Sequence, residues 1–168
     1  MSGRSTSAVV FPDTDPGQVA VAEAEEAAFG GTTLDAPATR EELTARVHEL
    51  VAGEWWRRNG PPVHVVAPRR STRSSTARRC GDGVEIRLAT EQLTIATAAH
   101  ELAHALAGID HGHDETFRAA HIDVVAVLGG RDAGARLSDA YLAFGLEVAP
   151  RRWSAPWRVG GIGFRVLP

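Results

Sequence analysis

The sequence predicts an α+β fold, a single small domain in which a short antiparallel sheet packs on a histidine-bearing helix and on further helices. Three observations predict it. Residues 98–121, AAHELAHALAGIDHGHDETFRAAH, hold five of the seven histidines and show apolar residues at helical spacing on both sides of a glycine-containing turn. Residues 75–90 form two extended runs around a glycine-flanked turn, as in a β-hairpin. The chain has 168 residues, 43% of them hydrophobic, which suffices for one sizeable core.

Composition divides the chain into a tail and one domain. Residues 1–16 are rich in Ser, Thr, Asp and Pro, so we expect a flexible N-terminal tail, and we expect residues 17–168 to form the domain. No run reaches the roughly 18 apolar residues of a membrane span, and no N-terminal run is long enough for a secretion signal. We therefore expect a cytoplasmic protein without a membrane partner. The single cysteine, Cys80, excludes a disulfide framework, and we expect it in the core.

Two helices and a strand are expected before the hairpin. The stretch GQVAVAEAEEAAFGG is rich in Ala and Glu and ends at paired glycines, which predicts a helix of about three turns. Apolar residues at helical spacing predict a second helix that runs from an N-cap at Thr39 to Asn59 and Gly60. The stretch VHVV, at 63–66, has the composition of a short strand.

The second run of the hairpin alternates apolar and charged residues. We expect Val84, Ile86 and Leu88 to pack inward. Glu85 and Arg87 then face solvent. We also expect this strand to lie at an edge of the sheet, where its free backbone groups can hydrogen-bond an extended peptide.

The histidine-rich stretch contains the motif His-Glu-x-x-His on a predicted helix. His100 and His104 are one turn apart, so their rings project side by side, close enough for one ion to bind a nitrogen of each. Glu101 follows the first histidine and can reach a water on that ion. In this motif two imidazoles hold Zn²⁺, the ion lowers the pKa of its water toward about 7, and the glutamate accepts the proton. We expect one Zn²⁺ per domain, with Glu101 as the catalytic general base.

A catalytic zinc needs a third protein ligand, and the sequence offers several. His111, His113, Asp114 and His121 are the candidates. Asp114 is also a suitable N-cap for the next helix, and it can orient a ligand ring instead of binding the ion. His121 lies two helical turns beyond His113, where a buried or orienting histidine is the alternative to a ligand.

The pair HELAH and GHDETF resembles the compact, minigluzincin-like zinc peptidases of the SprT-like and WLM families. In those families a histidine four residues before a phenylalanine completes the site, which implies His113 as the third ligand, with Phe117 in the matching position. The turn before His113 is longer than in WLM proteins, so His111 stays an alternative. The resemblance covers about residues 40 to 128 and implies a zincin-like fold and a metallopeptidase. HELAHALAG followed by DHGHD is closest to uncharacterised metallohydrolases of high-GC bacteria.

Hydrolysis of a peptide or protein substrate is the function that these observations favour. A zinc hydrolase of a small amide is the alternative, with a closed pocket that the acidic N-terminal helix covers. A nucleic-acid-associated metal-binding module is a third hypothesis, because residues 57–79 contain seven arginines and no acid, whereas residues 13–54 contain ten acids. The acidic helix can equally dock on that basic surface.

Tyr141 lies on a helix predicted at 132–144. It is a candidate oxyanion stabiliser, and the alternative is that it is a core residue. The sequence leaves the oligomeric state open.

Overall fold

The structure is a computed structural model that describes residues 15–68 and 73–157. These ranges contain six α-helices, two 3₁₀ helices and three strands, so the α+β class is confirmed. In chain order the elements are α1 (Pro16–Phe29), α2 (Arg40–Ala52), α3 (Glu54–Asn59), β1 (Val63–Val66), β2 (Thr76–Cys80), β3 (Gly83–Arg87), η1 (Thr90–Gln92), α4 (Ile95–Ala107), η2 (Ile109–His111), α5 (Glu115–Gly129) and α6 (Arg131–Ala143). None of the helices in the described ranges is both long and apolar enough to cross a membrane.

The sheet is mixed. Its strands lie in the order β1-β3-β2, with β3 antiparallel to β2 and parallel to β1. The hairpin is therefore confirmed, whereas the prediction of a purely antiparallel sheet was wrong. The physical reason is that the chain reverses direction between β1 and β2, and the hairpin then inserts β3 between these two strands. As a result, β3 runs in the same direction as β1.

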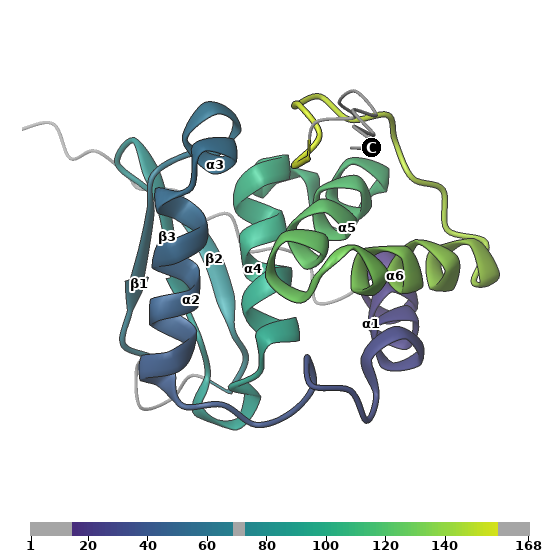
Figure 1. Cartoon of the computed structure of the whole chain (residues 1–168), viewed down its shortest axis with the longest axis horizontal. Coiled ribbons are helices and arrows are strands. Elements are labelled where there is room, and N and C mark those ends of the chain that lie inside the picture. Colours follow the sequence, from purple (N-terminus) through teal and green to yellow (C-terminus); the bar gives the residue numbers. More distant parts are fainter. Residues whose placement is uncertain (1–14, 69–72, 158–168) are drawn as a thin grey trace, which may run out of the picture.

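The central strand is β3, which we had predicted to lie at an edge. Paired on both sides, β3 is buried at four of its five residues, whereas β2 is exposed at four of five. Among the described strands, the free edge beside α4 belongs to β2, as Figure 1 shows. Cys80, which we expected in the core, is exposed because it ends this edge strand.

The apolar positions of β3 are buried as predicted, but one charged position is not where we expected it. Glu85 is only 9% exposed. Its Oε1 accepts hydrogen bonds from the Nε atoms of Arg78 and Arg87, both at 2.8 Å. Two guanidinium groups offset part of the cost of removing this carboxylate from water, because its charge stays paired. The outer face of the hairpin is thus closed by an ionic cluster.

The predicted long helix between Thr39 and Asn59 is divided in two. Thr39 and Glu42 form a capping box at the start of α2, in which each side chain bonds the other residue's backbone N–H. At Gly53 the backbone becomes extended, with φ −65° and ψ 150°, and α3 begins after it. Glycine stabilises helices poorly, which explains why the break occurs there.

The N-terminal helix begins earlier than we expected. Asp15 and Pro16, which we placed in the tail, are the N-cap and the first residue of α1. Residues 1–14, the rest of the predicted tail, lie outside the described residues. The early start matters because the side chain of Asp15 reaches the histidines.

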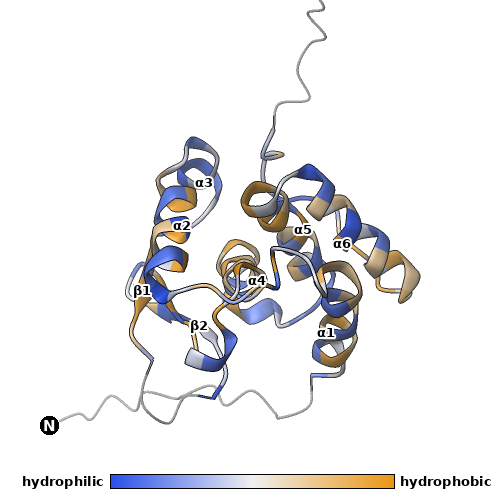
Figure 2. Ribbon diagram, turned by 60° about the horizontal axis from the view of Figure 1, so that its bottom comes forward, coloured by the Kyte–Doolittle hydropathy of each residue, from blue (hydrophilic) through white to orange (hydrophobic). Residues whose placement is uncertain are grey.

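The helix α4 lies at the centre of the molecule. Figures 1 and 2 both place it between the sheet with α2 on one side and α1, α5 and α6 on the other. It packs against α5, which in turn packs against α6, and α1 packs against α6. The buried side chains of these elements form one core, which includes Trp56, Ile86, Leu102, Phe117 and Leu137. One face of α4 is fixed in this core, and another carries the histidines.

Candidate metal centre

The helix α4 presents both histidines of the motif on one face. The Thr94 side chain accepts a hydrogen bond from the backbone of Thr97 and caps the helix, which ends at Gly108. His100 and His104 lie one turn apart, with ring centroids separated by 5.0 Å. The apolar residues on the other faces are buried, so a rotation of the helix would expose them. The core therefore sets the direction of the histidines.

A tight turn brings His113 back toward α4. Gly108 and Gly112 both have positive φ, 103° and 54°, a region that glycine occupies far more readily than other residues. The Asp114 side chain then caps α5, as predicted. The Nε2 atom of His113 consequently lies 3.0 Å from Nε2 of His100.

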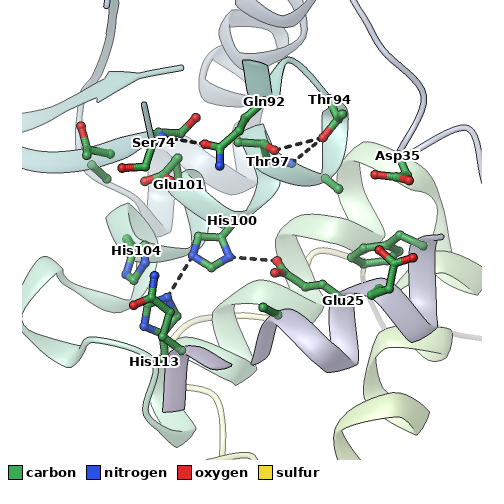
Figure 3. Close-up of a pocket in the computed structure, with 18 of the residues that line it drawn as sticks. Glu25, Asp35, Ser74, Gln92, Thr94, Thr97, His100, Glu101, His104 and His113 are labelled. Atoms are coloured by element: carbon green, nitrogen blue, oxygen red, sulfur yellow. Dashed lines mark hydrogen bonds and ion pairs between the residues drawn. The ribbon is translucent and has the colours of Figure 1, made fainter. Parts of the chain in front are cut away.

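Three imidazoles converge at this point. His100, His104 and His113 each offer a ring nitrogen, and the three nitrogens lie within 4.8 Å of one another (Figure 3). The Nδ1 atom of His100 donates to Glu25 at 2.8 Å, and Nδ1 of His113 donates to Asp15 at 2.9 Å. In neutral rings the lone pairs are then on the two Nε2 atoms, which face each other, and either a proton on His100 or a metal ion between the rings removes their repulsion. These residues form a group that can hold a metal ion, and imidazole donors suit Zn²⁺.

The environment keeps two of the three imidazoles neutral. Burial is the main cause that lowers the pKa of His104 to about 2, and repulsion from a charged His100 adds to it. Burial also lowers the pKa of His113, although hydrogen bonding to Asp15 acts against it. Burial acts to lower the pKa of His100 too, but the charge and hydrogen bond of Glu25 outweigh burial and raise it. Because a metal ligand must be deprotonated, neutral His104 and His113 favour metal binding.

Glu101 lies beside this group and lines the same cleft. It is 6% exposed, and burial raises its pKa to about 7, with the charge of His100 acting against this rise and that of Glu25 adding to it. A carboxyl group with a pKa near neutrality can accept a proton in one step and return it in the next.

The cleft over the histidines has a volume of about 540 Å³. Residues of α1 form one wall, and residues 74–77 at the start of β2 form another. The helix α4 supplies His100, Glu101 and His104, and the turn before α5 supplies His113 (Figure 3). The three imidazoles therefore lie between the N-terminal helix and the edge strand.

Similarity to known proteins does not assign a function to this cleft. Comparisons with protein-family models, with curated proteins and with solved structures find no match to the chain. Its chemistry is therefore inferred from the positions and surroundings of its side chains.

The other candidate ligands do not join the group of His100, His104 and His113. His111 is turned toward Asp114, and its Nδ1 atom donates to Oδ2 at 2.8 Å. Neither residue belongs to a metal-binding group among the described residues. His121 is fully buried and lies beside Glu25 and His100, with which it forms a second group of potential ligands.

Tyr141 lies in the core and does not line the cleft. Its hydroxyl oxygen is 2.7 Å from Nδ1 of His121, and burial raises its pKa well above the usual 10.0. This position fits the alternative of a core residue, because an oxyanion stabiliser must reach the reacting carbonyl.

Sequence analysis missed two residues of the site, Asp15 and Glu25. They lie 98 and 75 residues before the histidines that they contact. The one available signal was the excess of acids in residues 13–54, which suggested a helix docked on the arginine-rich surface or over the pocket. The helix packs on α6, forms one wall of the cleft and directs these two carboxylates toward the histidines.

Proposed function

We propose that the chain is a zinc-dependent metallohydrolase and, more specifically, a metallopeptidase of the zincin type. The observation that carries the proposal is the convergence of three imidazole nitrogens, from His100, His104 and His113, beside a buried glutamate in one cleft. A purely structural metal site has no use for a general base. Glu101 therefore favours turnover over metal storage.

The roles of the residues follow from their positions. His100, His104 and His113 would hold the zinc, which would polarise the scissile carbonyl and lower the pKa of a water molecule. Glu101 accepts the proton of the attacking water and then delivers it to the leaving amine. Burial raises the pKa of Glu101 above that of a free glutamate, which makes its carboxylate a better proton acceptor.

The edge strand favours a peptide over a small amide as the substrate. We expected an extended substrate to pair with a strand edge beside the metal, and β2 takes the place of β3 in that expectation. Within the described part of the sheet, β2 is paired on one side only, and residues 74–77 line the cleft. An extended peptide could add to this edge through main-chain hydrogen bonds, with its scissile bond near the histidines.

The lining of the cleft does not favour nucleic acid. Among the described residues, five carboxylates line it, from Asp15, Glu25, Glu26, Asp35 and Glu101, and no arginine does. These negative charges would repel a phosphate backbone. Three arginines of the basic stretch are also paired with acidic side chains, which leaves less positive charge for a nucleic acid.

Digestion of an unbiased peptide library by the zinc-loaded protein tests the proposal. We expect cleavage by the wild type, and a loss on the order of 10² to 10⁴ in rate for Glu101→Gln, because the amide keeps the volume of the side chain but accepts no proton. Zinc content should stay at one equivalent in this variant. Unchanged cleavage by Glu101→Gln would refute the mechanism, and cleavage of small amides without cleavage of peptides would favour the alternative substrate.

Peptides that carry N-methyl groups test the edge-strand part of the proposal. If the substrate pairs with β2, methylation of alternate backbone nitrogens should weaken binding, because those nitrogens donate to the strand, and methylation of the others should have less effect. Equal effects at all positions would argue against pairing with β2.

A further inference from the structure

The helix α1 carries a carboxylate at each end of the His100–His113 pair. Asp15 is its N-cap, and Glu25 lies in its second half. One helix therefore contacts two of the three proposed ligands on the ring nitrogens that point away from the metal position. Figure 3 shows Glu25 meeting His100 from the α1 side, opposite to the nitrogen that faces His113.

Asp15 is held by three backbone or ring N–H groups. Its Oδ1 accepts the N–H of Gly17 at 2.9 Å, which caps the helix. Its Oδ2 accepts the backbone N–H of His113 at 3.1 Å and the ring Nδ1–H at 2.9 Å. The same carboxylate thus begins α1 and fixes both the backbone and the ring of His113.

Glu25 is held by His100 and lies beside two buried polar groups. Its Oε1 accepts Nδ1–H of His100 at 2.8 Å and lies 3.4 Å from Nε2 of His121. His121 is fully buried, and its Nε2 has no hydrogen-bond partner among the described residues. Its other nitrogen, Nδ1, lies 2.7 Å from the hydroxyl of Tyr141. With the Tyr141 O–H directed to Nδ1, the proton of His121 is on Nε2, which lies near Glu25 without the geometry of a hydrogen bond.

We propose that α1 is a clamp for the metal site, in which Asp15 and Glu25 are positioning residues that fix the ring orientation and tautomer of His113 and His100. The proposal rests on the function proposed above. Each carboxylate holds the proton on Nδ1 and leaves the lone pair of Nε2 free for the ion. His121, whose Nδ1 lies 2.7 Å from the Tyr141 hydroxyl, flanks Glu25 on the core side.

The clamp implies that metal binding and the docking of α1 are coupled. If α1 docks, the two rings are pre-oriented and the metal binds more tightly. By linkage, the metal must then stabilise the docked helix by the same free energy. Zinc should accordingly slow amide hydrogen exchange in residues 16–29, although none of these residues would be a zinc ligand.

Another arrangement uses the same atoms. Glu25, His100 and His121 themselves form a group that can hold an ion, so Glu25 could be the ligand of a second metal. The contact of 2.8 Å between Glu25 and Nδ1 of His100 is that of a hydrogen bond, which favours a proton between them. Metal stoichiometry separates the two arrangements, because the clamp requires one equivalent per chain.

The test compares Glu25→Gln and Asp15→Asn with Glu23→Gln in the full chain. Glutamine and asparagine keep the side-chain volume, and asparagine is also a good N-cap, so α1 should still form. Glu23 is exposed on the same helix and provides a control for the loss of one charge. Zinc affinity, measured by competition with a chelator, should fall about 10-fold to 100-fold in the first two variants and stay unchanged in the third.

Two further readouts separate positioning from a structural role. The visible spectrum of the cobalt-substituted protein should change in Glu25→Gln, because the ring of His100 shifts, and should not change in Glu23→Gln. Zinc should protect residues 16–29 from hydrogen exchange in the wild type and less so in both carboxylate variants.

Several outcomes would overturn the clamp. Wild-type zinc affinity and an unchanged cobalt spectrum in both variants would show that the carboxylates do not position the ligands. A second zinc equivalent that disappears in His121→Ala would make Glu25 a ligand. These outcomes leave the proposed function intact, because that function is tested by the metal dependence of peptide cleavage and by Glu101→Gln.

Discussion

Replacement of His113 by alanine should abolish zinc binding, whereas replacement of His111 should leave it intact. Both residues lie in the same short turn, so His111→Ala is a matched control. His113 points at His100 with 3.0 Å between the two Nε2 atoms, while His111 is engaged with the Asp114 side chain at the surface. The two substitutions therefore perturb the backbone of the same turn to a similar degree. They differ in that only His113→Ala removes a ring that faces the proposed metal position.

The expected effect can be stated as a change in thermal stability. At a free zinc concentration 100 times the dissociation constant, binding stabilises the folded chain by about 2.7 kcal/mol. If removal of the third ligand raises that constant at least 100-fold, the gain falls to about 0.4 kcal/mol or less. For a chain of this size about 1 kcal/mol corresponds to roughly 2 to 4 °C in Tm. The wild type and His111→Ala should each gain about 5 to 10 °C from zinc, and His113→Ala almost nothing.

Differential scanning fluorimetry with and without zinc measures this shift, and metal analysis after gel filtration measures the stoichiometry. Each variant is compared with its own metal-free form, which removes any direct cost of the substitution from the comparison. The reasoning is refuted if His113→Ala keeps one equivalent of zinc and the full shift in Tm. Loss of zinc from His111→Ala alone would transfer the ligand role to His111.

Three other variants probe the surroundings of the site. Phe117→Ala should lower the free energy of unfolding by about 3 to 5 kcal/mol in chemical denaturation and weaken zinc binding, because the buried ring packs on His100 and His104 at centroid distances of 5.0 and 4.4 Å. Gly60→Ala should lower Tm, since a Cβ there would lie 2.3 Å from the ring of Trp56, and an unchanged Tm would contradict the described packing. Glu85→Gln should cost about 1.5 to 3 kcal/mol at neutral pH. Burial acts to raise the pKa of Glu85, but its two arginine partners hold it below 4.5, so the excess stability of the wild type should be present above that pH and shrink as the pH falls through the lowered pKa. A pH-independent difference in denaturant titrations would argue against the ionic cluster.

The sequence predicts best those elements of the fold that a few neighbouring residues determine. Thr39 and Asp114 cap their helices as expected, and the glycine-flanked turn forms the hairpin. These features depend on a few neighbouring residues, so their geometry can be derived without the rest of the chain. The pairing of β1 with β3 depends instead on a long-range choice between parallel and antiparallel neighbours, which the composition of VHVV does not encode.

Burial of charge is similarly hard to derive from alternation alone. Glu85 occupies a position that should face solvent, yet it is buried because Arg78 lies across from it on β2 and Arg87 lies on the same strand face. The alternation of apolar and charged residues predicts on which face of the sheet a side chain lies. Side chains from neighbouring strands decide whether that face is exposed to solvent.

The candidate site shows the same division between local and distant information. His100, Glu101 and His104 are set by the geometry of one helix, and His113 follows after a single turn, so one short stretch contains the whole proposed ligand set and the base. Asp15 could not be found in this way, because an aspartate before a helix is fully explained by capping. In the structure the two carboxylate oxygens of Asp15 have different partners: Oδ1 caps α1, and Oδ2 accepts a hydrogen bond from the ring of His113. Because capping already accounts for an aspartate at this position, its second contact can be recognised only in the fold, which places the start of α1 beside His113.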